Sequence, residues 1–187
     1  MVSPSVFLYG IILLTMSHPA QQEFFRKVKK EFPDSFHQVR VVDCGSLDVN
    51  GSFRDMFTVS DYTGVDIAQG KNVDVVSHIK DLEFEDGSFD TVISGEMLEH
   101  DETWRESLQK MYNMCKSGGL IAITCAGEGR REHGTKRTGA LWGTSPDYYM
   151  NLNEAHFKEV YKPDMFSQMF FEYNERAHDQ YFYGIKA

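Results

Sequence analysis

Residues 41–51, VVDCGSLDVNG, decide the fold of this chain. An apolar run ends in Asp43, and a turn that contains Gly45 follows it. A second short apolar run ends in Asp66. This order is typical of two successive parallel strands joined by a crossover, in which the acid at the end of the second strand accepts both ribose hydroxyls of an adenosine. We therefore expect an adenosine derivative as the ligand.

The composition of the turn indicates which adenosine derivative to expect. A dinucleotide-binding turn has further glycines that let backbone N–H groups approach a pyrophosphate, but Leu47 and Asn50 occupy those positions. Asp48 would repel a pyrophosphate, whereas it would attract the ammonium and the sulfonium of S-adenosylmethionine. The turn therefore favours S-adenosylmethionine over a dinucleotide, unless Gly45 and Gly51 only form a turn and the Asp48 side chain lies in water.

Further motifs follow in order along the chain. Residues 89–100 read FDTVISGEMLEH, preceded by LEFEDGS at 82–88 and followed by KSGG at 116–119. Together with the turn at Gly45, they make the chain from about residue 39 to about residue 124 resemble the class I S-adenosylmethionine-dependent methyltransferases. The resemblance implies an α/β fold of the Rossmann-like type. It is a three-layer sandwich around a mostly parallel seven-strand sheet in the order 3-2-1-4-5-7-6, with an antiparallel last strand.

Hydrophobic periodicity predicts where the strands and helices lie. Strands are expected at residues 39–43, 62–66, 73–76, 89–94, 119–124, 168–173 and 180–186, and helices at 20–31, 50–57, 103–116 and 153–160. We expect residues 19–187 to form one domain and residues 1–18 to be an N-terminal extension. The apolar run at 6–16 is too short to span a bilayer, and residues 1–5 lack the positive charge of a secretory signal.

Composition and charge limit the function classes. The 187 residues carry a net charge of −9, which argues against an extended nucleic-acid surface because phosphate contacts need clustered Lys and Arg. The three cysteines form no C-x-x-C pair and have no histidine at ligand spacing, so neither a disulfide framework nor a structural zinc is expected. We expect a cytoplasmic protein with no metal, no membrane and no nucleic-acid partner. The oligomeric state stays open.

Cofactor contacts are expected from the ends of the first four strands. Asp66 is expected to bind the ribose diol, and Ile67 to pack on the adenine face. Where the family commonly has a carboxylate for the adenine amino group, this chain has His78, so that contact falls to His78, to the N–H of Ile79 or to Asp81. The full expected set is Asp43, Gly45, Ser46, Asn50, Gly51, Asp66, Ile67, His78, Ile79, Ser94 and Glu96.

Two side chains after the fourth strand are candidates for catalysis. The Ser94 backbone and Glu96 lie at the edge where open α/β folds bind their ligands, so both are expected near the transferred methyl group, and His100 follows four residues after Glu96. The unperturbed pKa of histidine lies near neutrality, so His100 could be a general base. The resemblance also allows a structural role for this histidine, and methyl transfer can proceed by alignment alone.

Acceptor recognition is expected from residues 125–151, which follow the fifth strand. A connection of this length is functional more often than a short one. Its cationic side chains could bind an anionic acceptor, or they could lie in a solvated loop. Its aromatic rings could line an acceptor pocket, or they could pack in the core over the sheet. The candidates are Arg131, His133, Arg137, Trp142, Tyr148 and Tyr149.

The sequence thus predicts an S-adenosylmethionine-dependent methyltransferase that acts on a small-molecule acceptor. Two alternatives stay open. One is a protein that binds S-adenosylmethionine without transferring its methyl group. The other is a nicotinamide-dependent oxidoreductase, which Leu47, Asp48 and Asn50 disfavour.

Overall fold

The computed structural model describes residues 18–49, 51–139 and 147–187. The helices in these ranges are α1 (His18–Glu31), α2 (Trp104–Met114) and α3 (Glu154–Val160). The strands are β1 (Arg40–Cys44), β2 (Asp61–Asp66), β3 (Val75–Val76), β4 (Phe89–Gly95), β5 (Cys115–Ala126), β6 (Phe166–Asn174) and β7 (Asp179–Lys186). All seven predicted strands and three of the four predicted helices are therefore present.

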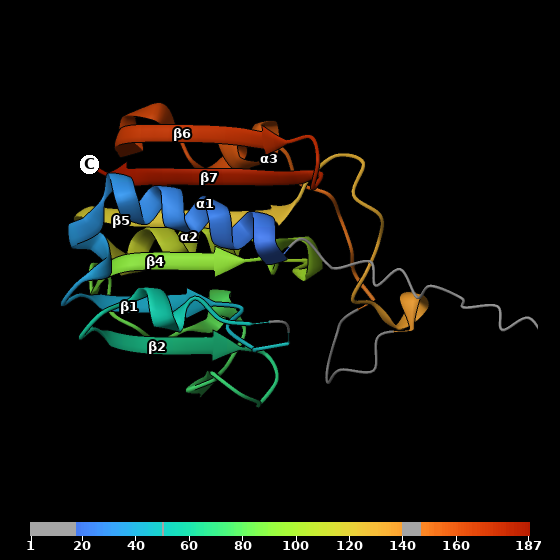
Figure 1. Ribbon diagram of the computed structural model, residues 1–187, viewed down its shortest axis with the longest axis horizontal. Coiled ribbons are helices and arrows are strands. Elements are labelled where there is room, and N and C mark those ends of the chain that lie inside the picture. The colour runs from blue at the N-terminus through green and yellow to red at the C-terminus, as the bar shows by residue number, and fades with distance from the viewer. Residues whose placement is uncertain (1–17, 50, 140–146) are drawn as a thin grey trace, which may run out of the picture.

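The strands form one sheet in the order β3-β2-β1-β4-β5-β7-β6 (Figure 1). The first five strands pair in parallel, while β7 runs antiparallel to both of its neighbours, β5 and β6. The predicted order and the antiparallel last strand are confirmed. Because the connection reverses direction between β1 and β4, the carboxyl ends of these strands form the edge where α/β sheets bind ligands.

Helices cover both faces of the sheet, which gives the predicted three layers (Figure 1). On one face, α1 buries Phe24 and Phe25 in a cluster with Val41 of β1. On the other face, α2 and α3 pack in a cluster that contains Val42. Val41 and Val42 are both fully buried because successive strand side chains point to opposite faces of a sheet covered on both sides.

The predicted helix at 50–57 is wrong. In the described part of this segment there is only a short 3-10 turn over Arg54–Met56. Asp48 accepts a hydrogen bond from the N–H of Gly51 at 2.7 Å, and the Ser52 hydroxyl accepts one from the N–H of Arg54 at 3.0 Å. These side chains satisfy backbone donors locally, which competes with helix formation.

The N-terminal predictions fall mostly outside the described residues. The apolar run at 6–16 and the predicted extension at 1–18, except for His18 itself, lie there, so the domain boundary stays a prediction. Among the described residues, no helix is both long and apolar enough to cross a membrane.

Candidate functional site

A cavity of about 200 Å³ lies at the carboxyl ends of β1 to β4. Six of the predicted site residues line it, namely Gly45, Asp66, Ile67, His78, Ile79 and His100. The remaining lining residues are Ser77, Lys80, Met97, Asp101, Glu102 and Thr103. Residues predicted from separate motifs thus meet around one cavity.

Gly45 brings the backbone of the turn after β1 to the cavity wall. This residue has a φ of +89°, a conformation that favours glycine, and a Cβ added there would lie 2.5 Å from the Cβ of Met97. Met97 also lines the cavity, so its side chain lies directly against the turn. The cavity volume is below the usual range for ligand pockets. An unbranched methionine can turn aside to enlarge it, because its side chain has three rotatable bonds.

Asp66 lies at the end of β2, and its two carboxylate oxygens accept hydrogen bonds from two different loops, one after β1 and one after β2. One oxygen accepts the N–H of Leu47 at 3.2 Å and the other accepts the N–H of Ala68 at 3.0 Å. Burial raises the pKa of this carboxyl, while these backbone hydrogen bonds lower it. A carboxylate offers about four lone-pair sites, so acceptor capacity is left for a ligand diol.

The turn after β1 uses its own backbone donors. The N–H groups of Gly45 and Ser46 both donate to the carbonyl of Val65, at 2.8 and 3.0 Å. The N–H of Leu47 donates to Asp66, and that of Asp48 donates to the carbonyl of Lys71 at 3.1 Å. A dinucleotide site needs such groups for its pyrophosphate. In this turn, the N–H groups of residues 45–48 already donate hydrogen bonds to acceptors within the protein.

Three other predicted cofactor residues form hydrogen bonds within the protein. Asp43 is buried and accepts a hydrogen bond from the Tyr62 hydroxyl, and burial raises the pKa of Asp43 to about 7. Ser46 donates to the carbonyl of Asn72 at 3.0 Å, and Ser94 donates to the carbonyl of Cys44 at 2.7 Å. None of these three residues lines the cavity.

Two more predictions concern the loop that follows. Gly51 is exposed and away from the cavity lining, and Asn50 lies outside the described residues. On the adenine side, His78 and Ile79 both line the cavity, whereas Asp81 is exposed and forms an ion pair with Lys80 at 2.7 Å. The geometry therefore favours His78 and Ile79 over Asp81 for an adenine contact.

The two catalytic candidates lie in different surroundings. His100 lines the cavity, and burial lowers its pKa to about 4, so the ring is neutral at pH 7. Glu96 does not line the cavity, and both of its carboxylate oxygens are shielded from solvent. Burial raises the pKa of Glu96 well above its usual range, and the neighbouring Glu99 adds to the shift. The low pKa of His100 makes it a weak general base.

The predicted acceptor residues separate into two groups. His133 and Tyr149 face His100, with ring centroids 5.3 and 5.4 Å from the His100 ring. Arg137 is paired with Glu132, to which its Nη2 lies 2.8 Å away. Arg131 is exposed, although its carbonyl accepts a hydrogen bond from the Tyr149 hydroxyl at 3.2 Å.

Two of the aromatic candidates remain. The Tyr148 hydroxyl donates to the Met150 sulfur at 3.2 Å, and Trp142 lies outside the described residues. The positive charge of residues 125–151 is also partly neutralised, because Arg130 forms an ion pair with the buried Asp179 at 3.0 Å.

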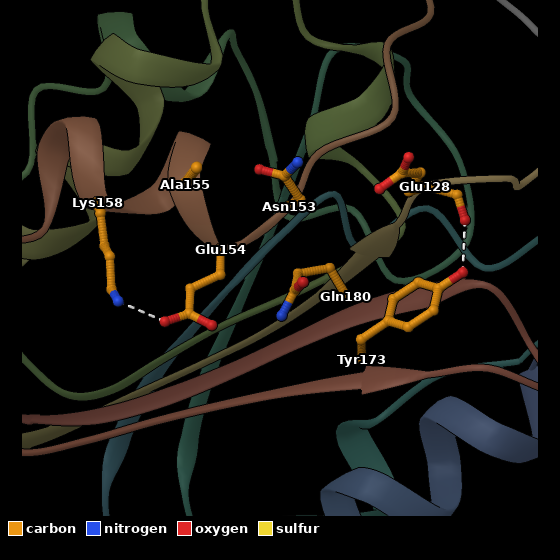
Figure 2. Close-up of a pocket in the computed structure, with 7 residues that line it drawn as sticks. All are labelled: Glu128, Asn153, Glu154, Ala155, Lys158, Tyr173 and Gln180. Atoms are coloured by element: carbon orange, nitrogen blue, oxygen red, sulfur yellow. Dashed lines mark hydrogen bonds and ion pairs between the residues drawn. The ribbon is translucent and has the colours of Figure 1, made fainter.

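A second, more open hollow of about 570 Å³ lies beside α3 (Figure 2). It contains none of the predicted site residues. Lys158 is paired with Glu154, and the Tyr173 hydroxyl donates to the carbonyl of Glu128 at 2.5 Å (Figure 2). Several of its polar side chains are thus already paired, and the smaller cavity, which the predicted residues line, is the better candidate site.

Sequence reasoning missed Glu99. This residue is fully buried, and it lies three positions after Glu96, at a 3-10 turn over Leu98–His100. The spacing E-x-x-E-H was the available signal that two carboxylates and an imidazole would gather at one place.

Comparison with known proteins agrees with this geometry. The family model described as "Methyltransferase domain" matches residues 41–123, which run from β1 into β5. This match covers less than half of the chain and agrees with the predicted resemblance to the class I S-adenosylmethionine-dependent methyltransferases. Among curated proteins, no sequence relative is found.

Solved methyltransferases share the fold at low identity. Phosphoethanolamine N-methyltransferase 2 from Haemonchus contortus, solved with phosphomonomethylethanolamine and S-adenosylhomocysteine, has a TM-score of 0.62 and 18% identity over 88% of this chain and 52% of that chain. The 1,6-didemethyltoxoflavin-N1-methyltransferase of Burkholderia thailandensis has a TM-score of 0.57 and 14% identity, over 91% and 84%. A possible histamine N-methyltransferase from Thermotoga maritima has a TM-score of 0.57 and 13% identity, over 92% and 97%.

These likenesses concern the fold. The chain spans about half the length of the Haemonchus contortus enzyme, so that enzyme has a large part without a counterpart in this chain.

Proposed function

We propose that this chain binds S-adenosylmethionine in the cavity at the ends of β1 to β4 and transfers its methyl group to a small-molecule acceptor. The observation that carries the proposal is the convergence of Gly45, Asp66, Ile67 and His78 on one cavity in a methyltransferase domain.

Each of these residues has a role that its position supports. The acceptor capacity left on Asp66 suits the two ribose hydroxyls, and Ile67 offers an apolar surface to the adenine. Gly45 lets the backbone approach the methionine part, where a Cβ would meet Met97. The remaining predicted contacts, from Asp43, Ser46 and Ser94, act by holding the strand ends in place. The committed N–H groups of the turn argue against a nicotinamide dinucleotide.

The chemistry needs alignment more than acid–base help. S-adenosylmethionine supplies a methyl group on a positively charged sulfur, so an acceptor lone pair can form the new bond to carbon as the carbon–sulfur bond breaks. A protein accelerates such a step mainly by holding the two reactants in line. His100 lies between the cavity and the residues His133 and Tyr149, so the acceptor is expected on that side.

The acceptor class is the finer part of the proposal. The Haemonchus contortus and Burkholderia thailandensis enzymes were solved with small molecules, which supports a small acceptor here. Arg131 and Lys136 are exposed cations of the segment whose charge fits an anionic group, whereas Arg130 and Arg137 are paired with acids.

A turnover screen tests the proposal. The chain is incubated with S-adenosylmethionine carrying a labelled methyl group and with amine, hydroxyl, carboxylate and carbon acceptors, and the labelled product is measured. We expect labelled product from one acceptor class, and at least about tenfold less from the Asp66→Ala variant at the same subsaturating cofactor concentration. Cofactor binding without labelled product from any class would instead support the non-catalytic alternative.

A further inference from the structure

A cluster of acid and imidazole side chains lies beside the cofactor cavity. Glu96, Glu99 and His100 follow β4, and His133 follows β5. One possible ligand atom from each of Glu99, His100 and His133 lies within 4.8 Å of the other two. We propose that these three side chains, with Glu96 beside them, bind a divalent transition-metal ion. This site was not expected from the sequence, for which no metal was predicted.

Uncompensated carboxylate oxygens point to a missing partner. Among the described residues, neither oxygen of Glu96 and neither oxygen of Glu99 has a hydrogen-bond partner, although all four are shielded from solvent. Buried polar atoms are almost always hydrogen-bonded, and unpaired buried charges are costly. A bound cation would satisfy these oxygens together.

The local charge balance fits a dication. Three acids are buried here, namely Glu96, Glu99 and Asp179, and Arg130 pairs with Asp179. Apart from that ion pair, the cluster contains the carboxylates of Glu96 and Glu99 and two neutral imidazoles. These two shielded carboxylates lack a full opposite charge, because the nearby Arg130 is engaged by Asp179. A dication would supply that charge and keep both carboxylates ionised.

His133 is oriented as a metal ligand. Its Nδ1 lies 3.1 Å from the carbonyl of Arg131, which only accepts, so Nδ1 carries the proton. The lone pair is then on Nε2, which lies 3.8 Å from an oxygen of Glu99. The Tyr149 hydroxyl lies 3.2 Å from Nδ1 and holds the ring from the same side. Metal-bound histidines commonly have their second nitrogen fixed in this way.

The donor set indicates the kind of ion. Two imidazoles with carboxylates suit Zn²⁺, Mn²⁺ or Co²⁺ better than Mg²⁺ or Ca²⁺, which prefer oxygen ligands alone. Ligand atoms about 2.1 Å from one ion lie roughly 3 to 4 Å apart, so small side-chain rotations would close the present spacing. Zn²⁺ is expected to bind more tightly than Mn²⁺.

The position of the site gives the ion a use. His100 belongs both to this cluster and to the cofactor cavity lining. An ion there could hold an acceptor hydroxyl or carboxylate oxygen next to the methyl group, and it would lower the pKa of a bound hydroxyl, so no protein base would be needed. This use rests on the proposed methyl transfer, whereas metal binding itself does not.

Metal binding can be measured without cofactor. The full chain, free of any affinity tag and treated with a chelator, is titrated with Zn²⁺, Mn²⁺ or Mg²⁺ while its melting temperature is followed, and with Co²⁺ while visible absorption is recorded. We expect Zn²⁺ to raise the melting temperature with one ion bound per chain, Mg²⁺ to have the smallest effect, and Co²⁺ to give an absorption band.

Variants locate the site. His133→Asn and Glu99→Gln should each weaken Zn²⁺ binding by at least about tenfold, and Tyr149→Phe by about tenfold through the orientation of His133. His37→Asn is the matched control, because His37 is exposed and outside the cluster. In the presence of chelator, Glu99→Gln should be at least as stable as the unmodified chain because it removes an uncompensated buried charge.

The outcomes separate this proposal from the proposed function. No response to any of these ions, or a Zn²⁺ response that His133→Asn and Glu99→Gln leave unchanged, would overturn the metal site. Stabilisation by tetramethylammonium in place of metal would also overturn it and would make the cluster a pocket for a cationic acceptor. S-adenosylhomocysteine binding to the chelated chain is measured in parallel, so a failed metal site leaves the cofactor assignment standing.

Discussion

The two sides of the candidate site are assembled differently. On the cofactor side, Gly45 and Asp66 each lie at or directly after the end of a strand, and the parallel sheet alone brings them together. On the acceptor side, Glu99, His133 and Tyr149 come from three separate segments outside the strands. The position of a residue at a strand end can be predicted from the sequence pattern. Loop side chains meet only when the loops follow particular paths.

Asp66→Ala should produce the largest effect on the cofactor side. It removes a carboxylate expected to accept two hydroxyls, and hydrogen bonds to charged groups each contribute about 1.5–3 kcal/mol. S-adenosylhomocysteine affinity should fall at least about tenfold in calorimetry, with the fold retained by circular dichroism. Asp81→Ala is the control, because Asp81 is exposed and outside the cavity lining. Unchanged affinity in a folded Asp66→Ala chain would mean that the ribose binds elsewhere.

Gly45→Ala should damage both stability and cofactor binding. The left-handed backbone conformation costs a non-glycine residue about 1–2 kcal/mol, and the new Cβ would also meet Met97. Gly118→Ala is a matched control, since Gly118 has a φ of +76° but open space around its Cβ position. Denaturant unfolding should show the larger loss for Gly45→Ala, and only this variant should weaken S-adenosylhomocysteine binding. Equal losses would show that the approach to Met97 is unimportant.

Asp43 should make stability depend on pH. Its pKa rises from 3.8 to about 7 on burial. A group whose pKa is raised by folding contributes stability below its unfolded pKa, and that contribution is lost as pH rises through the folded value. The free energy of unfolding should therefore fall relative to that of Asp43→Asn between about pH 4 and pH 7.

Urea unfolding across this pH range measures the difference. Asp61→Asn, at an exposed position of β2, provides the comparison variant. A constant difference between the unmodified chain and Asp43→Asn across the range would contradict the buried position of the Asp43 carboxyl.

Neutralising Arg131 and Arg137 together should produce the smallest effect. Both belong to the acceptor side, so S-adenosylhomocysteine affinity should stay nearly constant. The KM for an anionic acceptor should rise by no more than about fivefold at low salt, because exposed ion pairs contribute little and Arg137 is already paired with Glu132. The rise should shrink as salt is added. Full activity of the double variant at low salt would mean that these cations only face water.

The resemblance to a known family predicted the order of the strands, and the residue pattern at the strand ends predicted part of the cavity lining. The acids that end β1 and β2 and the glycine between them have fixed positions relative to the sheet, and the positions of Asp66 and His78 followed from that. The helix at 50–57 could not be excluded from periodicity, because its absence depends on hydrogen bonds from Asp48 and Ser52 to backbone N–H groups.

The acceptor side could be predicted only in part. His133 and Tyr149 were identified as aromatic and polar residues in a long connection, but their approach to His100 depends on how that connection folds back. The pairing of Arg130 with Asp179 joins positions far apart in the chain, so the sequence alone does not show that the charge of Arg130 is neutralised. Glu99 was missed because the E-x-x-E-H spacing at 96–100 does not show whether the backbone turns Glu99 into the interior or leaves it in solvent.

Calorimetric titration of the chain with S-adenosylhomocysteine and, separately, with NAD tests the central claim most directly. The backbone donors of the turn at Gly45 to Asp48 are already committed, and Asp66 retains acceptor capacity for a ribose. We therefore predict saturable binding of S-adenosylhomocysteine at one site and no measurable binding of NAD under the same conditions. Binding of NAD with equal or higher affinity would contradict the assignment of this cavity to S-adenosylmethionine.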